Sequence, residues 1–222
     1  MKIVAVVPIK LTNERFQGKN IRMLGCKPLI QYILDTLLDV ELIDEIYVYC
    51  SNIDICEYLV EGVNFLKRNP DLDLPTVKFS DIQIPFSRTI PADVYVLAHC
   101  TAPFLTKNTI KKCITSVVSS GYDSAFAAEI LQDFLWMDGK PLNFNPLSIP
   151  RTQDLPYIYK ESTGIYVYRN EILNKYHRRI GFNPYIAVIS GKEALDIDYL
   201  EDFELAEYYI MKGDNDYGLS NP

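Results

Sequence analysis

The sequence lacks the features of a membrane protein and of a nucleic-acid-binding protein. No apolar stretch approaches the ~20 residues of a membrane-spanning helix, and the N-terminal apolar run is too short for a signal sequence and is interrupted by a proline. The net charge is −7, with 22 Lys and Arg against 29 Asp and Glu, whereas broad nucleic-acid binding needs a basic surface. We therefore expect a cytoplasmic protein with neither a membrane nor a nucleic acid as partner.

Cysteine pairs are also missing. The five cysteines are odd in number and scattered, and none forms a C-x-x-C pair. A disulfide framework or a zinc site would need closer and more regular spacing. We expect reduced thiols, most of them buried.

The first half of the chain alternates strand and helix patterns. With 222 residues, 48% of them hydrophobic, the chain can bury a large core. Buried strands are predicted at 2–8, 45–49, 93–98 and 123–130, and helices at 28–38, 53–60 and 107–119, the last capped by Thr106. The region 69–91 reads as irregular, with one short strand around Val77. This order predicts an α/β fold with a mainly parallel sheet.

The second half has a different pattern. Residues 132–144 read as a hairpin that turns at Asp138-Gly139. A strand, a helix, a strand and a final helix are predicted at 163–168, 170–176, 185–189 and 199–211. We expect one domain over residues 1–222 that carries a small β-rich insertion.

Three segments should meet at the carboxyl ends of the parallel strands, where ligands bind in open sheets. They are the loop 9–20, the turn 99–104 and the region of Asp196 and Asp198. The loop offers cations and amides that can wrap a triphosphate, namely Lys10, Arg15 and Lys19 with Asn13 and Asn20. Gly18 stands alone, so the loop is neither a Walker A nor a dinucleotide motif; a solvated surface loop is the alternative.

Asp196 and Asp198 are two residues apart. In extended backbone both carboxylates point to one side, which suits Mg²⁺ with its preference for one or two carboxylates plus phosphate oxygens. Asp198 and Glu201 also have capping-box spacing, so Asp198 could instead cap the last helix.

His99 and Cys100 lie side by side at the end of a predicted strand. A Cys/His nucleophile pair is unfavoured, because adjacent strand residues point to opposite faces. His99 remains a candidate for substrate contact, with a packed side chain as the alternative.

These segments, in this order, resemble the cytidylyltransferases that make CMP-activated acid sugars, the CMP-N-acetylneuraminate synthetases and their relatives. The resemblance covers most of the chain, and the Asp196–Asp202 stretch is its most specific part. It rests on Ile9 to Arg15, Gly18-Lys19-Asn20, Lys27-Pro28-Leu29-Ile30, Arg68-Asn69-Pro70, His99 to Phe104, Pro150-Arg151-Thr152-Gln153, Thr163-Gly164-Ile165-Tyr166 and Asp196 to Asp202.

The resemblance implies a Rossmann-like nucleotidyltransferase sheet and transfer of CMP from CTP to a sialic-acid-like sugar acid. It implies Mg²⁺ held by Asp196 and Asp198, and a homodimer formed through an insertion at 131–184. Its implied catalytic residues are Lys19, Arg15 and Asp198. Its implied nucleotide contacts are Lys10, Asn13, Asn20, Arg68 and Thr101, and its implied acceptor contacts are His99, Arg151 and Phe182.

Other functions remain open at this level. The acceptor could be an alditol phosphate, a sugar 1-phosphate or a 3-deoxy sugar acid. Glu14 and His99 stand where the family pattern has a lysine and a glutamine, and they favour the further alternative of a non-catalytic dimeric homologue.

Overall fold

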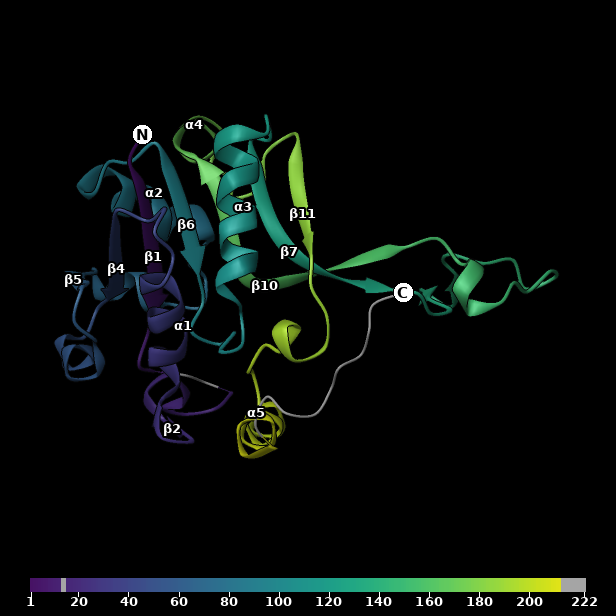
Figure 1. Cartoon of the computed structure of the whole chain (residues 1–222), viewed down its shortest axis with the longest axis horizontal. Coiled ribbons are helices and arrows are strands. Elements are labelled where there is room, and N and C mark those ends of the chain that lie inside the picture. Colours follow the sequence, from purple (N-terminus) through teal and green to yellow (C-terminus); the bar gives the residue numbers. More distant parts are fainter. Residues whose placement is uncertain (13–14, 213–222) are drawn as a thin grey trace.

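A seven-stranded sheet with helices on both faces forms the body of the molecule (Figure 1). The computed structural model describes residues 1–12 and 15–212. The strand order is β11-β7-β10-β6-β1-β4-β5, and of these strands β10 alone runs antiparallel to its neighbours. The mainly parallel α/β fold predicted from the sequence is confirmed.

The elements have the following bounds. The strands of the main sheet are β1 (Ile3–Ile9), β4 (Glu45–Cys50), β5 (Val63–Lys67), β6 (Val94–Ala98), β7 (Ser124–Leu131), β10 (Ile158–Arg169) and β11 (Pro184–Val188). Two short pairs are β2 (Met23–Leu24) with β3 (Lys27–Pro28), and β8 (Trp136–Met137) with β9 (Lys140–Pro141). The α-helices are α1 (Leu29–Leu38), α2 (Phe79–Thr89), α3 (Lys107–Ser119), α4 (Asn170–Tyr176) and α5 (Leu200–Lys212).

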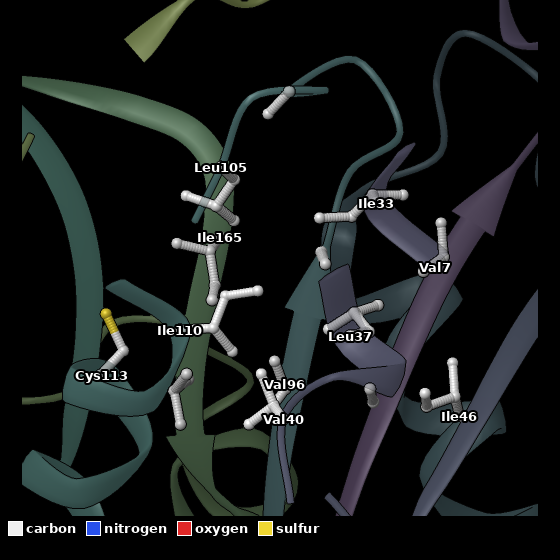
Figure 2. Packing of buried hydrophobic residues seen from close by; sticks show 14 of the residues in the cluster. Val7, Ile33, Leu37, Val40, Ile46, Val96, Leu105, Ile110, Cys113 and Ile165 are labelled. Atoms are coloured by element: carbon white, nitrogen blue, oxygen red, sulfur yellow. The ribbon is translucent and has the colours of Figure 1, made fainter. Parts of the chain in front are cut away.

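One face of the sheet is covered by α1 and α3. Figure 2 shows Ile33 and Leu37 of α1 and Ile110 of α3 directed toward Val7 and Val96 of the sheet. These side chains are fully buried, and each contributes roughly 1.5–3 kcal/mol through burial. The odd-numbered residues of β1, from Ile3 to Ile9, pack in this layer. Because β1 is buried on both faces, its sequence is a nearly continuous apolar run.

The other face is covered by α2 and α4 and is rich in tyrosine. Tyr95, Tyr168 and Phe86 are buried there. The Tyr168 hydroxyl donates to Oε1 of Gln83 at 3.1 Å, and the Tyr95 hydroxyl accepts from the amide of Ala92 at 3.0 Å. The buried hydroxyls therefore have partners, which removes the cost of placing them in a core.

Several local predictions are confirmed. Helix α3 begins after Thr106, whose hydroxyl accepts from the amide of Thr109 at 3.2 Å. The hairpin of β8 and β9 turns at Asp138 and Gly139, both with positive φ (50° and 75°), as a two-residue type I′ turn requires.

The region before β6 was predicted less well. The strand expected around Val77 is wrong, and the segment expected at 53–60 as a helix is a 3-10 helix, Ile53–Tyr58. Strand β5 and helix α2 were not predicted. Helix α2 contains Pro85, which is unfavourable inside a helix, but burial of Phe86 against the tyrosine-rich face offsets this cost.

The ends of β7 and β10 extend beyond the sheet and carry an arm, defined here as residues 132–157, which projects away from the body (Figure 1). The predicted insertion, 131–184, includes more than this arm, because Ile165–Arg169 of β10 pair with β6 in the middle of the sheet. The role of the insertion in dimerisation stays a prediction. Within the described ranges, no helix is long and apolar enough to cross a membrane.

Candidate active site

The three segments predicted to meet at the carboxyl edge of the sheet do meet there. Lys10 follows β1 and His99 follows β6, and these strands are parallel neighbours. The amide of Ile197 donates to the carbonyl of Thr101 at 2.8 Å. This bond ties the segment of Asp196 and Asp198 to the turn after β6.

Lys19 is a buried cation at this edge. Its Nζ donates to the carbonyl of Ile197 at 2.5 Å and to Oδ1 of Asp198 at 3.0 Å. The loop that carries it is anchored by Phe16, whose ring packs edge-on against Phe203 of α5 at 5.4 Å. A buried ammonium is tolerated only with such partners, so Lys19 holds a fixed charge beside Asp198.

Asp198 receives a second cation. Arg15 donates from Nη1 to Oδ2 of Asp198 at 2.7 Å. The carboxylate of Asp202, and not that of Asp198, accepts the two amides that directly precede α5, from Asp198 at 2.9 Å and Tyr199 at 2.8 Å. The alternative in which Asp198 only caps the last helix is therefore wrong: its side chain bonds to Lys19 and Arg15.

Asp196 faces a different partner. Thr163 of β10 donates to its Oδ2, while Oδ1 is buried and has no hydrogen-bond partner among the described residues. An unpartnered carboxylate oxygen is costly in a protein interior and fits the requirement of a cation. In the part of the chain that the structure describes, no group of three His, Cys, Asp or Glu side chains could hold a metal, so a metal held here would need ligands from elsewhere.

His99 and Cys100 point to opposite faces of the sheet, as predicted. Burial lowers the pKa of His99 to about 4, with Asp196 opposing and Arg179 and Lys19 reinforcing the shift. Cys100 donates from Sγ to Oδ1 of Asn20 at 3.2 Å, and burial raises its thiol pKa to about 12. His99 is therefore neutral at pH 7, and Cys100 is a protonated thiol in the core, not a nucleophile.

Asn20 joins the ends of two strands. Its Nδ2 donates to the carbonyl of Lys10 at 2.9 Å, and its Oδ1 accepts from Cys100. The amide thus holds the loop after β1 against the end of β6. The nucleotide contacts predicted for Lys10, Asn20 and Thr101 stay predictions.

Arg68 lies at the end of β5, on the same edge. Its side chain is 3% exposed; Nη2 donates to the carbonyl of Ile9 at 2.9 Å and pairs with Asp73, which also accepts from Ser51. Its Nε is buried without a partner among the described residues. Asp73 and Ser51 were not predicted from the sequence, because their contacts depend on where the end of β5 lies in the folded sheet.

Two predicted acceptor residues lie away from this edge. Arg151 is on the arm, 71% exposed, and pairs with Asp154. Phe182 is exposed and packs on Tyr176 at 4.9 Å; its amide bonds to Asp123, which directly precedes β7. Within one chain the structure therefore does not bring them to Lys19 and Asp198. Asn13 and Glu14 lie outside the described residues.

The sheet, with cations and carboxylates gathered at its carboxyl edge, defines the fold class of Rossmann-like nucleotidyltransferases. A CMP:2-keto-3-deoxy-manno-octonic acid synthetase, solved in complex with CTP, is similar in structure, with a TM-score of 0.73 at 17% identity over 96% of this chain and 99% of that one. At this identity the likeness concerns the fold.

The chain belongs to the cytidylyltransferase family, whose model matches residues 4–213. It is 25% identical to N-acylneuraminate cytidylyltransferase A of Danio rerio over 87% of this chain and 47% of that protein. It is 27% identical to CMP-N,N'-diacetyllegionaminic acid synthase of Legionella pneumophila over 93% of this chain and 95% of that protein. The chain thus spans about half the length of the fish relative.

Proposed function

We propose that the protein transfers CMP from CTP to a sialic-acid-like sugar acid, a nonulosonate, and releases pyrophosphate. The observation that carries the proposal is the convergence of Lys19 and Arg15 on Asp198, next to Asp196, at the carboxyl edge of the sheet. Membership of the cytidylyltransferase family and the similarity to sugar-acid cytidylyltransferases support the reaction class.

The reaction needs charge stabilisation more than a strong base. A hydroxyl of the acceptor attacks the α-phosphorus of CTP in line, a new P–O bond forms, and the bond to the pyrophosphate oxygen breaks. Negative charge grows on the leaving pyrophosphate and on the α-phosphate oxygens. Lys19 and Arg15 supply fixed positive charge where the loop after β1 meets this edge.

Asp196 and Asp198 would hold Mg²⁺. The unpartnered Oδ1 of Asp196 and the exposed part of Asp198 fit a hard cation that takes its other ligands from phosphate oxygens and water. The ion, when bound, neutralises charge on the α-phosphate. Arg15 and Lys19 balance the charge of Asp198, and we propose that their remaining N–H donors bind the phosphates when CTP enters.

A 3-deoxy sugar acid is the second candidate acceptor. The chain is 22% identical to a 3-deoxy-manno-octulosonate cytidylyltransferase of Christiangramia forsetii over 90% of this chain and 85% of that protein. The two candidates share a carboxylate and a hydroxyl that attacks phosphorus, so the proposed chemistry at the α-phosphate is the same for both.

We also propose that the protein is a homodimer. The arm exposes large apolar side chains that the body leaves uncovered; among them are Trp136, Met137, Leu147 and Ile149. A concentration of exposed apolar side chains on one element marks an interaction surface. The exposed apolar side chains and the family resemblance thus both support a dimer interface that includes the arm.

A pyrophosphate-release assay tests the proposed function. The purified protein is supplied with CTP, Mg²⁺ and one of three acceptors: N-acetylneuraminate, N,N'-diacetyllegionaminate or 3-deoxy-manno-octulosonate. We expect turnover with a nonulosonate and CTP, and far less with ATP, GTP or UTP. The proposal fails if CTP neither binds nor turns over with any acceptor; faster turnover of the octulosonate would assign the second candidate.

A further inference from the structure

A cavity of about 220 Å³ opens beside His99, on the face of the sheet that α2 covers. Phe79 and Ile82 of α2 and Leu97 of β6 form apolar walls. The polar groups on its lining are the amide of Gln83, the imidazole of His99 and the guanidinium of Arg179. An apolar cavity with a few converging polar groups is the usual form of a small-molecule site.

Arg179 is held in place over this cavity. Its guanidinium carbon lies 3.9 Å from the centre of the Tyr166 ring, and its Nη2 pairs with Oε1 of Glu161 at 3.2 Å. Glu161 also accepts from the Tyr166 hydroxyl. Stacking and a single described acceptor orient the guanidinium while the fork keeps further N–H donors for a ligand.

The loop that carries Arg179 is tied to the start of β7. Asp123 accepts the amides of Phe182 at 2.6 Å and Asn183 at 3.0 Å, and the amide of Gly181 donates to Ser124 at 2.8 Å. A Cβ at Gly181 would lie 2.3 Å from the carboxylate of Asp123, so this close approach requires glycine. The position of Arg179 is therefore built into the fold and does not depend on a free surface loop.

The cavity adjoins the proposed reaction centre. The imidazole of His99 lines it and also lies within electrostatic range of Asp196, Lys19 and Arg179. A ligand bound against His99 would therefore lie close to Arg179 and near the cluster of Lys19 and Asp196. This is the arrangement an acceptor needs when one of its ends is anchored and the other attacks phosphorus.

We propose that Arg179 binds the carboxylate of the sugar-acid acceptor in this cavity, in the chain that also supplies Lys19 and Asp198. The assignment rests on the proposed cytidylyl transfer and moves the acceptor anchor from Arg151 to Arg179. Arg151 is on the arm and already pairs bidentately with Asp154, whereas Arg179 is the one cation on the cavity lining. A planar guanidinium suits a carboxylate better than an ammonium does, because it can donate two parallel hydrogen bonds.

The test compares Arg179→Met and Arg179→Lys with Lys175→Gln. Lys175 is an exposed cation on α4 that pairs with Glu171 and does not line the cavity, so Lys175→Gln removes one positive charge from the same part of the surface. Steady-state rates are measured with varied CTP and with varied N-acetylneuraminate or 3-deoxy-manno-octulosonate, each also supplied as its methyl ester. Thermal unfolding of each variant, with and without CTP, checks the fold and nucleotide binding.

We expect Arg179→Met to raise the KM for the acid by about 30-fold, the loss expected for a charge-assisted hydrogen bond, with the KM for CTP unchanged. Preference for the acid over its ester should disappear in Arg179→Met and return partly in Arg179→Lys; Lys175→Gln should behave as wild type.

An unchanged acid KM in Arg179→Met, or an equal rise for acid and ester, overturns the assignment and leaves cytidylyl transfer standing. Absence of CTP binding and turnover in the wild type overturns both. If Arg179→Met does not fold, the Arg179→Lys variant decides. A weaker preference for the acid over its ester in Arg179→Lys supports the assignment, and an unchanged preference overturns it.

Discussion

The carboxyl edge of the sheet and the arm each contain an arginine–aspartate pair, and the two pairs differ in burial and in reach. Arg68 at the edge is 3% exposed and bonds to Asp73 and to the carbonyl of Ile9. Arg151 on the arm is 71% exposed and bonds to Asp154, three residues away. The bond from Arg68 to Ile9 joins the ends of two strands, whereas the pair of Arg151 is local and solvated, and such surface pairs contribute little to stability.

The difference concerns more than one pair. At the edge, strands that are far apart in sequence end together, so that Lys19, Asp198 and Thr163 come from three distant segments. The arm projects from the body (Figure 1). It has its own two-stranded hairpin and exposes apolar side chains. This contrast supports chemistry at the edge and association through the arm.

The largest effect is expected at Lys19. Lys19→Met removes the buried ammonium beside Asp198 and should lower kcat/KM for CTP by roughly 100- to 1000-fold, the range for loss of one preorganised charge-stabilising donor. Lys160→Met is the control, because Lys160 is an exposed lysine that pairs with Glu129 on β7. Steady-state pyrophosphate release measures both, and similar losses in the two variants would contradict a special role of the edge.

The two arginine pairs should differ in stability. Arg68→Met leaves the carboxylate of Asp73 in a mostly buried position without its cation, with only Ser51 still donating to it among the described residues. The variant should lower the free energy of unfolding by about 3 kcal/mol. Arg151→Met should leave the urea midpoint unchanged, since its pair is solvated. Urea denaturation followed by circular dichroism measures both changes. An equal loss for the two variants would contradict the distinction.

His99 at the edge should make stability depend on pH. The folded pKa of His99, about 4, lies below the ordinary value of 6.5, so the folded state binds fewer protons than the unfolded state between these values. The stability associated with neutral His99 is present above pH 6.5 and is lost as the pH falls toward 4, by up to about 3 kcal/mol. His99→Gln should flatten this part of the stability profile.

The smallest effect on the edge should come from the arm. Trp136→Ser combined with Leu147→Ser removes two exposed apolar side chains and should weaken dimerisation by at least about tenfold, as loss of an aromatic interface anchor does. Light scattering over a range of concentrations measures the mass, and circular dichroism checks that the body stays folded. A monomeric wild type, or a double variant that dimerises as well as wild type, would contradict the proposed interface.

Local signals predicted most of the fold. Three local signals each predicted one element correctly: the apolar run of β1, the cap at Thr106 and the Asp138-Gly139 turn. They did so because these structures depend on residues that are neighbours in sequence. Helix α2 was missed because Pro85 and several serine and threonine residues disfavour a helix locally, while burial of Phe86 and Gln83 favours it. Strand β5 was missed because it is a short edge strand without a regular apolar alternation.

The sequence by itself determined the fold class, the family resemblance and the three segments that meet at the carboxyl edge, since strand order and local patterns carry this information. Only the tertiary structure decided which charges are neighbours. It placed Lys19 and Arg15 on Asp198, set Arg151 apart on the arm and brought Arg179 to the cavity beside His99. The physical reason is that these contacts join residues up to 183 positions apart, and their geometry follows from how the sheet and its covering helices pack.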